Sequence, residues 1–375
     1  MAELFSNISN VTLPQVVMWL IGGVLIYLAI RKDMEPTLLL PLGFGTILVN
    51  LPLSGAVNQI YNGVVESGAV DVLFGAGIAN ELFPLLLFIG IGAMIDFTPL
   101  LANPKLMIFG AASQFGIFFT MSLAALLGFS LKDAASIGII GAADGPTSIF
   151  VANFFNSKYV GAIMVAAYSY MALVPMVQPP VIKALTTQHE RRIRMPYAQK
   201  SVSKRTRILF PIVITMIAGI VSPRSVALIG FLMFGNLIRE CGVLDALSET
   251  AQRVLSNLVT LLLGLTIATK MQAQYFLTCE TLMIIALGLV AFVFDTAGGV
   301  LFAKLVNLFL PKEKKINPMI GAAGISAFPM SARVIHKMGL KEDNQNFLLM
   351  HAIGVNVSGQ IASVIAGGLI LNMLG

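Results

Sequence analysis

The sequence has few charged residues. Only 11% of its 375 residues are Asp, Glu, Lys or Arg, whereas a soluble globular chain carries roughly 25%. Hydrophobic residues make up 57%, and long apolar runs recur along the whole chain. This composition excludes an ordinary soluble domain and indicates a protein whose helices cross a lipid membrane several times.

Cysteine and histidine are also scarce. Cys241 and Cys279 cannot make a disulfide framework, and the three histidines show no metal-ligand spacing, so structural zinc and thiol chemistry are excluded. Seven of the 24 basic residues lie between Arg191 and Arg207, so the net charge of +6 is a local topology signal and does not indicate nucleic-acid binding. No basic residue precedes the first apolar run, which we therefore expect to remain in the mature protein.

Apolar runs long enough, or nearly long enough, to span a membrane occur on both sides of a basic linker at 186–207. We predict five spans before the linker and five after it, at about 13–30, 37–53, 82–101, 106–128 and 160–183, and at about 208–222, 225–240, 257–276, 280–310 and 345–374. Each half also contains one segment that is too rich in Gly and Pro for a plain spanning helix, at 136–155 and at 317–338. The shared layout indicates an internal duplication.

The two interrupted segments share a motif. Residues Gly138 to Ser148 read GxxGxxxxPxS, and Gly321 to Ser331 repeat the pattern without a gap. Five crossings per repeat is an odd number, so the second copy enters the membrane from the opposite side, which is an inverted-topology repeat.

We therefore predict an all-α polytopic membrane protein with two inverted repeats. Each repeat has about five transmembrane helices and one re-entrant or broken hairpin, in an elevator-type transporter architecture. The expected parts are scaffold helices and a connecting segment in 1–81, a transport part in 82–185, the cytoplasmic linker 186–207, scaffold helices in 208–256, and a second transport part in 257–375. Positive-inside bias favours re-entrant hairpins, and a broken helix that crosses fully is the alternative.

Asp144 lies inside the first interruption among apolar neighbours. A carboxylate at membrane depth costs at least about 2.5 kcal/mol unless it is neutralised, so Asp144 is either protonated, bound to a cation, or paired with a buried Arg. Uncharged oxygens and freed carbonyls hold hard monovalent cations. Such oxygens lie in or beside the interrupted segments, at Gly141, Ser148, Asn317, Gly324, Ser326, Ser331, Asn356, Ser358 and Gln360.

Four other residues have candidate roles. Tyr168 and Tyr170 follow the first hairpin, where a phenol either relays a proton or lies at the membrane interface. Arg333 is a permanent cation that either binds a substrate carboxylate or faces cytoplasmic water. Asp295 is a second acid in an apolar helix. A weaker similarity between the two halves lies upstream of the motif. Gly90 precedes Asp96 by the same six residues that separate Gly264 from Lys270, so these two charged residues occupy matching places.

Three stretches make the family recognisable: Gly141 to Ser148, Asn317 to Arg333, and Asn356-Val-Ser-Gly. These stretches resemble the beta subunit of biotin-dependent sodium-translocating decarboxylases, and the resemblance covers nearly the whole chain. The resemblance implies that a carboxyl group delivered as carboxybiotin is released as CO2, that a proton is consumed and that Na+ is exported. The family's key positions correspond to Asp144, Tyr170, Asn317, Gly321, Ser326, Arg333 and Asn356.

The resemblance also implies roles and partners. Catalysis falls to Asp144, Tyr170 and Arg333, and substrate binding to Arg333, Asn317 and Gly321. The Na+ ligands are Asp144, Gly141, Ser148, Gly324, Ser326, Asn356 and Ser358. The implied assembly is a trimer of beta subunits with a gamma subunit, an alpha carboxyltransferase and a biotin carrier domain, in a bacterial cytoplasmic (inner) membrane.

Two questions stay open: which substrate the partner enzyme uses, and whether the chain belongs to a pump or to a secondary transporter. The compact chain resembles beta subunits paired with methylmalonyl-CoA or glutaconyl-CoA carboxyltransferases, which favours these over oxaloacetate. A secondary sodium symporter or exchanger with the same architecture would equally explain the hairpins, Asp144 and Arg333. Co-purification with a biotinylated protein would separate a pump subunit from that alternative.

Overall fold

The structure is a computed structural model that describes the chain except residues 1–8, 62–63, 197–200 and 222. Nearly all of its elements are helices, and the described residues contain one two-stranded antiparallel ribbon. The elements before the linker are α2 (Leu13–Lys32), α3 (Pro36–Val49), β1 (Gln59–Tyr61), β2 (Val64–Glu66), α4 (Ala69–Gly77), α5 (Leu82–Met94), α6 (Thr98–Ala102), η2 (Pro104–Leu106), α7 (Met107–Ser113), α8 (Phe115–Leu126), α9 (Leu131–Gly138), η3 (Ile139–Ala142), α10 (Gly145–Phe154) and α11 (Val160–Leu185).

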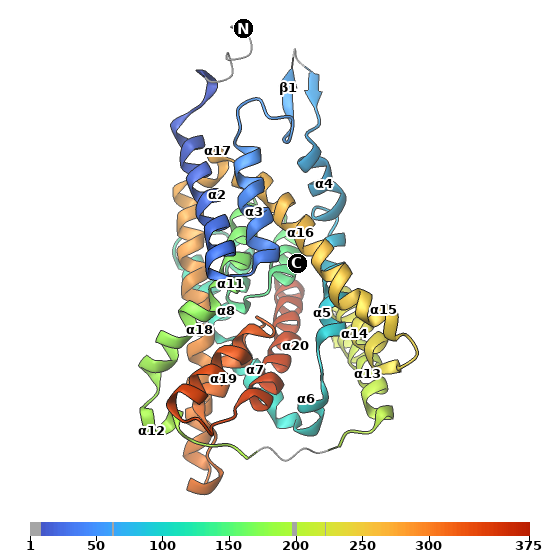
Figure 1. The fold of residues 1–375 in the computed structure, drawn as a ribbon, viewed down its shortest axis with the longest axis vertical. Coiled ribbons are helices and arrows are strands. Elements are labelled where there is room, and N and C mark those ends of the chain that lie inside the picture. Colours follow the sequence, from blue (N-terminus) through green and yellow to red (C-terminus); the bar gives the residue numbers. More distant parts are fainter. Residues whose placement is uncertain (1–8, 62–63, 197–200, 222) are drawn as a thin grey trace.

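The linker carries α12 (Gln188–Arg191), and further elements follow. They are α13 (Lys204–Val221), η4 (Pro223–Ser225), α14 (Val226–Cys241), α15 (Asp245–Glu249), the π-helix η5 (Thr250–Leu255), α16 (Ser256–Ile267), η6 (Ala268–Met271), α17 (Ala273–Phe276), α18 (Cys279–Phe309), η7 (Lys312–Lys314), η8 (Pro318–Gly324), α19 (Met330–Glu342) and α20 (Leu349–Leu374). Figure 1 shows α18 running along most of the long axis, with α12 and α19 near the lower end.

The described helices make this a multi-pass membrane protein with fewer long spans than the ten predicted. Five segments are long and apolar enough to cross a bilayer, and two bent pairs raise the number to seven. The five are Leu13–Lys32, Pro104–Leu126, Asp245–Met271, Cys279–Phe309 and Leu349–Leu374. The bent pairs are Ala69–Gly77 with Leu82–Met94, at 63°, and Val160–Met171 with Leu173–Leu185, at 69°.

Local hydrogen bonds and backbone geometry explain why some predicted runs are shorter. The predicted run 37–53 stops as α3 at Val49, because Asn50 turns its amide back to the carbonyl oxygens of Thr46 and Met271, each at 2.8 Å. The predicted run 82–101 is divided where the backbone becomes extended at Ile95, and α6 begins at Thr98, whose N–H donates to the Asp96 carboxylate at 2.9 Å. Hydropathy averages over such local interruptions.

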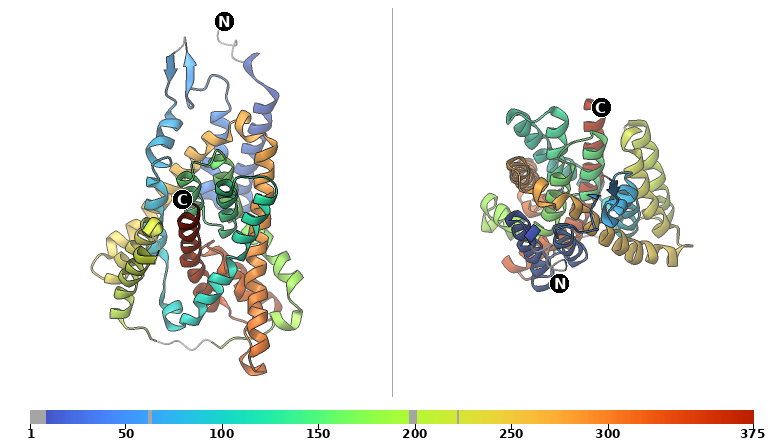
Figure 2. Two further views of the ribbon diagram at one scale, coloured as in Figure 1. Left: turned by 180° about the vertical axis from the view of Figure 1, so that it is seen from behind. Right: turned by 90° about the horizontal axis from the view of Figure 1, so that it is seen from above.

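The interior is organised around α18 and α20. Helix α18 packs against η8, η3, α7, α8 and α11, and α20 packs against α7, η8 and α10. Helices α3 and α16 pair, as do α5 and α14, and α13 and α14 form one edge of the molecule when seen from above (Figure 2). The order of elements after the linker (two helices, a helix of several pieces, a long helix, an interrupted segment and a final long helix) resembles the order before it, apart from the β1–β2 ribbon and α4, which are found in the described residues of the first half alone.

Candidate functional site

The first interrupted segment folds back on itself. Helix α9 continues into η3, Ala143 then adopts a left-handed backbone with φ of 51°, and Asp144 begins α10 as its N-cap. At the open end, the Ser157 hydroxyl donates to the carboxylate of Asp133 at 2.6 Å. The two ends of this segment therefore lie together, with the break at Ala143 and Asp144 forming the tip.

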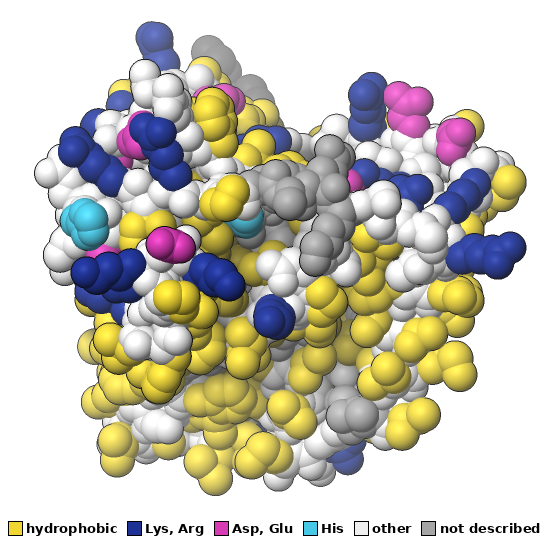
Figure 3. Space-filling view, turned by 90° about the horizontal axis from the view of Figure 1, so that it is seen from below, with side chains coloured by type: hydrophobic (Ala, Val, Ile, Leu, Met, Phe, Trp, Pro, Cys, Tyr) yellow, Lys and Arg dark blue, Asp and Glu magenta, His cyan; other side chains and the backbone are white. Residues whose placement is uncertain are grey.

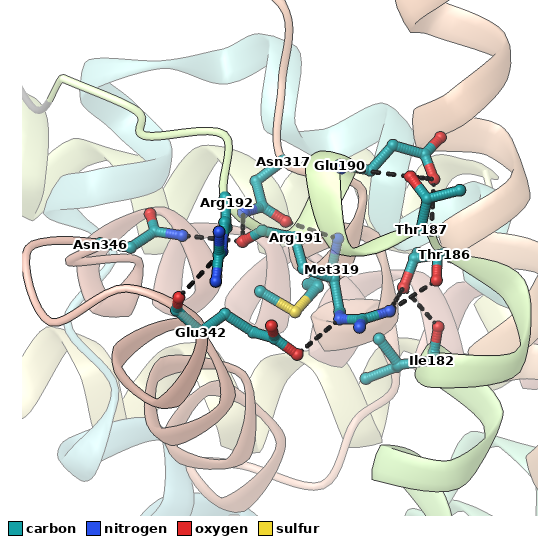
Figure 4. Close-up of polar contacts among 10 residues, drawn as sticks. All are labelled: Ile182, Thr186, Thr187, Glu190, Arg191, Arg192, Asn317, Met319, Glu342 and Asn346. Atoms are coloured by element: carbon teal, nitrogen blue, oxygen red, sulfur yellow. Dashed lines mark hydrogen bonds and ion pairs between the residues drawn. The ribbon is translucent and has the colours of Figure 1, made fainter.

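The second interrupted segment has the same shape. It begins as η8, turns through Ile325 to Pro329 and returns as α19. Both of its ends contact the linker (Figure 4): the Asn317 amide donates to the Arg191 carbonyl at 2.8 Å, and the Arg191 guanidinium donates to the Glu342 carboxylate at 2.8 Å. The open end of this hairpin is thus held by Arg191, the last residue of α12.

The two tips meet inside the protein. The N–H of Ser326 in the second tip donates to the Ala142 carbonyl in the first tip at 2.9 Å. Helix α20 runs beside this contact, because the Ser326 hydroxyl donates to the Gly359 carbonyl at 3.1 Å and the Gln360 amide donates to the Ser326 carbonyl. Elements that are far apart in the sequence therefore build one buried polar centre.

Asp144 lies in this centre and is 4% exposed. Its carboxylate accepts the Thr147 hydroxyl at 2.7 Å and the Ser363 hydroxyl at 3.3 Å. No basic side chain among the described residues forms an ion pair with it. The Tyr168 ring packs against Gly145, and its buried hydroxyl has no hydrogen-bond partner among the described residues.

Two amide oxygens on α20 are also buried without a donor. Asn356 uses its NH2 group on the carbonyls of Ala323, at 3.0 Å, and Ile325, at 2.7 Å, which leaves its Oδ1 without a partner among the described residues. The Oε1 of Gln360, one helical turn later, is also buried without a hydrogen-bond partner among the described residues. Buried oxygens that lack donors, close to a carboxylate, are the chemistry that hard cations require. The residues present therefore fit Na+.

The structure brings some of the predicted residues to this centre and places others elsewhere. Ser148 is adjacent, since its hydroxyl donates to the Asp144 carbonyl at 2.9 Å. Asn317 lies at the open end of the second hairpin. Ser358 is on a different face of α20, where its hydroxyl donates to the carbonyls of Val355 and Leu106.

Three predicted glycines have packing contacts. Gly141 lies against the carboxylate of Asp295, and the Gly324 carbonyl accepts the Gln114 amide at 3.2 Å. Gly321 touches Gly299 backbone to backbone, where a Cβ on Gly321 would lie 2.0 Å from the Gly299 carbonyl oxygen. Gly321 therefore holds the second hairpin against α18.

Tyr170 and Arg333 lie outside the hydrogen bonds of the Asp144 centre. The Tyr170 hydroxyl donates to the Ile285 carbonyl, and its ring stacks on Phe292 with centroids 6.4 Å apart. Arg333 lies in the first turn of α19 and lines a cavity of about 440 Å3. Its side chain is exposed, and the described residues offer it no ion pair within 4.0 Å.

Sequence reasoning did not select Thr147 or Ser363 and did not prefer Tyr168 over Tyr170. Ser363 follows Gln360 by three residues and so lies on the same face of α20, which is a signal that helical periodicity offers. Thr147 is at the N3 position of the helix that Asp144 caps, which capping rules also identify. The choice between the two tyrosines depends on the rotation of α11, which the sequence leaves open.

Basic side chains gather at the end of the molecule where the linker lies. Figure 3, seen from below, shows Lys and Arg side chains on two raised parts of this face and hydrophobic side chains along its flanks. Positive charge beside apolar flanks is typical of the cytoplasmic end of a membrane protein.

Fold and site together define a multi-pass membrane protein in which two hairpins enclose a buried acid and unpartnered oxygens suited to a cation. The chain belongs to the family of Na+-transporting oxaloacetate decarboxylase beta subunits, whose family model matches residues 14–374. It is 49% identical over 363 residues to the methylmalonyl-CoA decarboxylase subunit beta of Veillonella parvula, covering 97% of this chain and 94% of that protein.

Two other relatives show similar coverage. The glutaconyl-CoA decarboxylase subunit beta of Acidaminococcus fermentans is 49% identical over 96% of this chain and 93% of its own length. The oxaloacetate decarboxylase beta chain of Klebsiella pneumoniae is 45% identical over 95% of this chain and 94% of its own length. All three are beta subunits of decarboxylases, which confirms the family resemblance seen in the motifs.

Proposed function

We propose that this chain is the membrane subunit of a sodium pump that releases CO2 from carboxybiotin, consumes a proton and exports Na+. The observation that carries the proposal is the buried centre where Asp144 and the oxygens of Asn356 and Gln360 lie beside the touching hairpin tips. Kinship with decarboxylase beta subunits supports the pump over a symporter or exchanger that performs no chemistry.

In this proposal Na+ is the cargo of the Asp144 centre. The carboxylate supplies the negative charge, and Ser148, Ser326 and Asn356 keep the tip geometry or supply oxygens. When Na+ has left, the carboxyl takes up a proton, so that ion and proton compete for one anionic group. An unpaired carboxylate at membrane depth is unfavourable, so the emptied site favours the protonated form.

Carboxybiotin, carried by a partner subunit, enters the cavity lined by Arg333. The planar guanidinium has no competing carboxylate partner within 4.0 Å among the described residues, so its donors are available for the N-carboxylate of the substrate. The cavity volume of about 440 Å3 is within the range of roughly 300–1,000 Å3 that small-molecule sites occupy. Asn317 supports this site indirectly, by fixing the open end of the hairpin that leads to Arg333.

We further propose an inverted repeat and an elevator movement. The similar element order and the two hairpins that meet tip to tip support a two-fold relation between the halves. In this arrangement 82–185 and 257–375 form the transport part and 1–81 and 208–256 form the scaffold, joined by the cytoplasmic linker 186–207, of which residues 197–200 lie outside the described part of the chain. Movement of one part against the other would expose the centre to each side in turn.

The assembly we propose contains three beta subunits, a gamma subunit, an alpha carboxyltransferase and a biotin carrier domain, in a bacterial inner membrane. Beta subunits that are named for different substrates support a division of labour in which another polypeptide chooses the carboxylic acid or CoA ester. This chain then contributes the decarboxylation and transport steps, which are shared.

The test replaces Asp144 by Asn in the complete complex, reconstituted in inverted vesicles. We expect Na+ uptake driven by decarboxylation to be lost while the complex still assembles, because the amide cannot neutralise Na+ or exchange a proton. The apparent Na+ affinity of the wild type should weaken as pH falls, since protons compete for the same carboxylate. Wild-type uptake in Asp144→Asn with loss in Asp295→Asn would move the ion site to Asp295.

A further inference from the structure

The Arg333 cavity contains an acid that the proposed function does not yet use. The cavity is walled by the connection between α2 and α3 and by one face of α19 along most of its length, and prolines of α11 also line it. The charged residues that face it are Asp33, Glu35, Arg333, Lys337 and Lys341. Of these, Glu35 is half-buried and lines the same cavity as Arg333.

The backbone holds Glu35 in an unusual conformation. Asp33 and Glu35 both have positive φ, 52° and 38°, although neither is glycine, and Met34 between them is 8% exposed. Left-handed backbone at non-glycine residues is unfavourable and is found where the surrounding structure imposes it, often at functional sites. Burial of Met34 fixes this turn and directs its neighbours to the cavity.

The carboxyl group of Glu35 is not used structurally. Although Glu35 is the N-cap of α3, its side chain makes no capping hydrogen bond, and the described residues give it no ion pair within 4.0 Å. Burial raises the pKa of this carboxyl above its ordinary value, and the charge of Asp33 raises it further, while Arg333 acts in the opposite direction. A carboxyl with these properties is a proton donor at higher pH than an exposed glutamate.

We propose that Glu35 is the general acid that protonates biotin as CO2 leaves. This inference rests on the proposed function of the Arg333 cavity. In the step, the bond between the carboxyl carbon and the ureido nitrogen of carboxybiotin breaks, its electron pair stays on the nitrogen, and CO2 departs. The Glu35 proton moves to that nitrogen, leaving a carboxylate that water in the cavity reprotonates before the next turnover.

The arrangement also links chemistry to conformation. Arg333 belongs to α19, in the proposed transport part, whereas Glu35 belongs to the α2–α3 connection, in the proposed scaffold. The carboxylate anchor and the proton donor then face each other only when α19 lies under that connection. Decarboxylation is thereby confined to one position of the transport part, which a coupled pump requires.

The experiment uses the complete complex and follows single-turnover release of CO2 from its carboxylated biotin. We expect Glu35→Gln to slow this release by about 100-fold or more, as loss of a general acid does. Glu35→Asp should restore part of the rate. In the wild type the rate should fall as pH rises through the pKa of Glu35, and this alkaline decline should vanish in Glu35→Gln, which a purely structural role would not produce.

Glu81→Gln is the matched control. Glu81 also has a positive φ, at 65°, and is also the N-cap of a helix without a side-chain capping bond, but it lies away from the cavity. Its substitution should leave CO2 release and its pH profile unchanged. A wild-type profile in Glu35→Gln, together with loss of release in Arg333→Ala, would overturn the role of Glu35 alone. Normal release in both variants would overturn the proposed function of the cavity as well.

Discussion

At the scale of single residues, Gly321 has two roles that an experiment can separate. The family resemblance assigns it to substrate binding, whereas the structure places it in backbone contact with Gly299. Replacement by alanine would put a Cβ 2.0 Å from the Gly299 carbonyl oxygen. Because backbone must move to relieve this overlap, we expect Gly321→Ala to cost about 1–3 kcal/mol of stability. Thermal unfolding of the purified complex in detergent measures this loss.

Gly23 offers a control for that substitution. It lies within α2, and an added Cβ there would meet nothing within 4 Å, so Gly23→Ala should be neutral or slightly stabilising. If Gly321→Ala instead unfolds like the wild type but decarboxylates slowly, substrate contact becomes its main role.

At the scale of elements, the clamp between the linker and the second hairpin should respond to pH. Its Arg191–Glu342 pair is 2.8 Å long and mostly buried, and the hydrogen bond and charge of Arg191 lower the pKa of Glu342 from its ordinary value of 4.5. A carboxyl whose pKa is lowered in the folded protein stabilises the fold at pH values above its ordinary pKa. That contribution is lost as the pH falls through the lowered pKa. We expect Glu342→Gln to lower the unfolding temperature at pH 7, with the difference shrinking below about pH 4.5.

The pair Arg253–Glu249 is the comparison for this test. It has similar length, 3.2 Å, but both side chains are largely exposed, at 77% and 66%. Exposed pairs contribute little, so Glu249→Gln should barely change the unfolding temperature at any pH. An equal effect of the two substitutions would mean that the clamp adds nothing beyond a surface charge pair.

The same scale shows what the sequence predicts well. Repetition of GxxGxxxxPxS located both interrupted segments, because Gly and Pro interrupt helices through backbone geometry alone. It also located Asp144 and Ser326, which the structure brings to the meeting tips. Asn356 lies outside the repeat and was selected as a polar residue beside it and from the family resemblance. The ends of α3 and α5 were wrong in the prediction. Asn50 follows α3 and bonds to Met271, a tertiary neighbour, and the backbone becomes extended at Ile95 directly after α5.

The sequence predicted a role for Arg333, but it did not predict that Glu35 lines the same cavity. Arg333 and Glu35 are nearly 300 positions apart, and no periodicity relates the α2–α3 connection to α19. The ribbon β1–β2 and α4 were likewise absent from the prediction, because residues 51–81 carry neither a long apolar run nor a repeat. Such features follow from how elements pack, which local patterns do not encode.

At the scale of the whole molecule, the hairpins decide how the chain is threaded through the membrane. The Ser157–Asp133 bond places both ends of the first segment together, and the contacts of Asn317 and Glu342 with the linker do the same for the second. A fully crossing broken helix would instead separate its ends by the thickness of the bilayer. The two arrangements differ in which side each end faces.

Cysteine labelling distinguishes them in a background without Cys241 and Cys279. Single cysteines at the exposed positions Lys132 and Asn156, which flank the first hairpin, should both react with a membrane-impermeant thiol reagent added outside. Cysteines at Lys315 and Asn344, which flank the second hairpin, should react only from the cytoplasmic side. A cysteine in place of Ser203 in the basic linker should do the same. If 132 and 156, or 315 and 344, react from opposite sides, that segment crosses the membrane. The proposed odd number of crossings per half would then be lost, and with it the proposed inverted relation, through which one buried carboxylate would face both sides in turn.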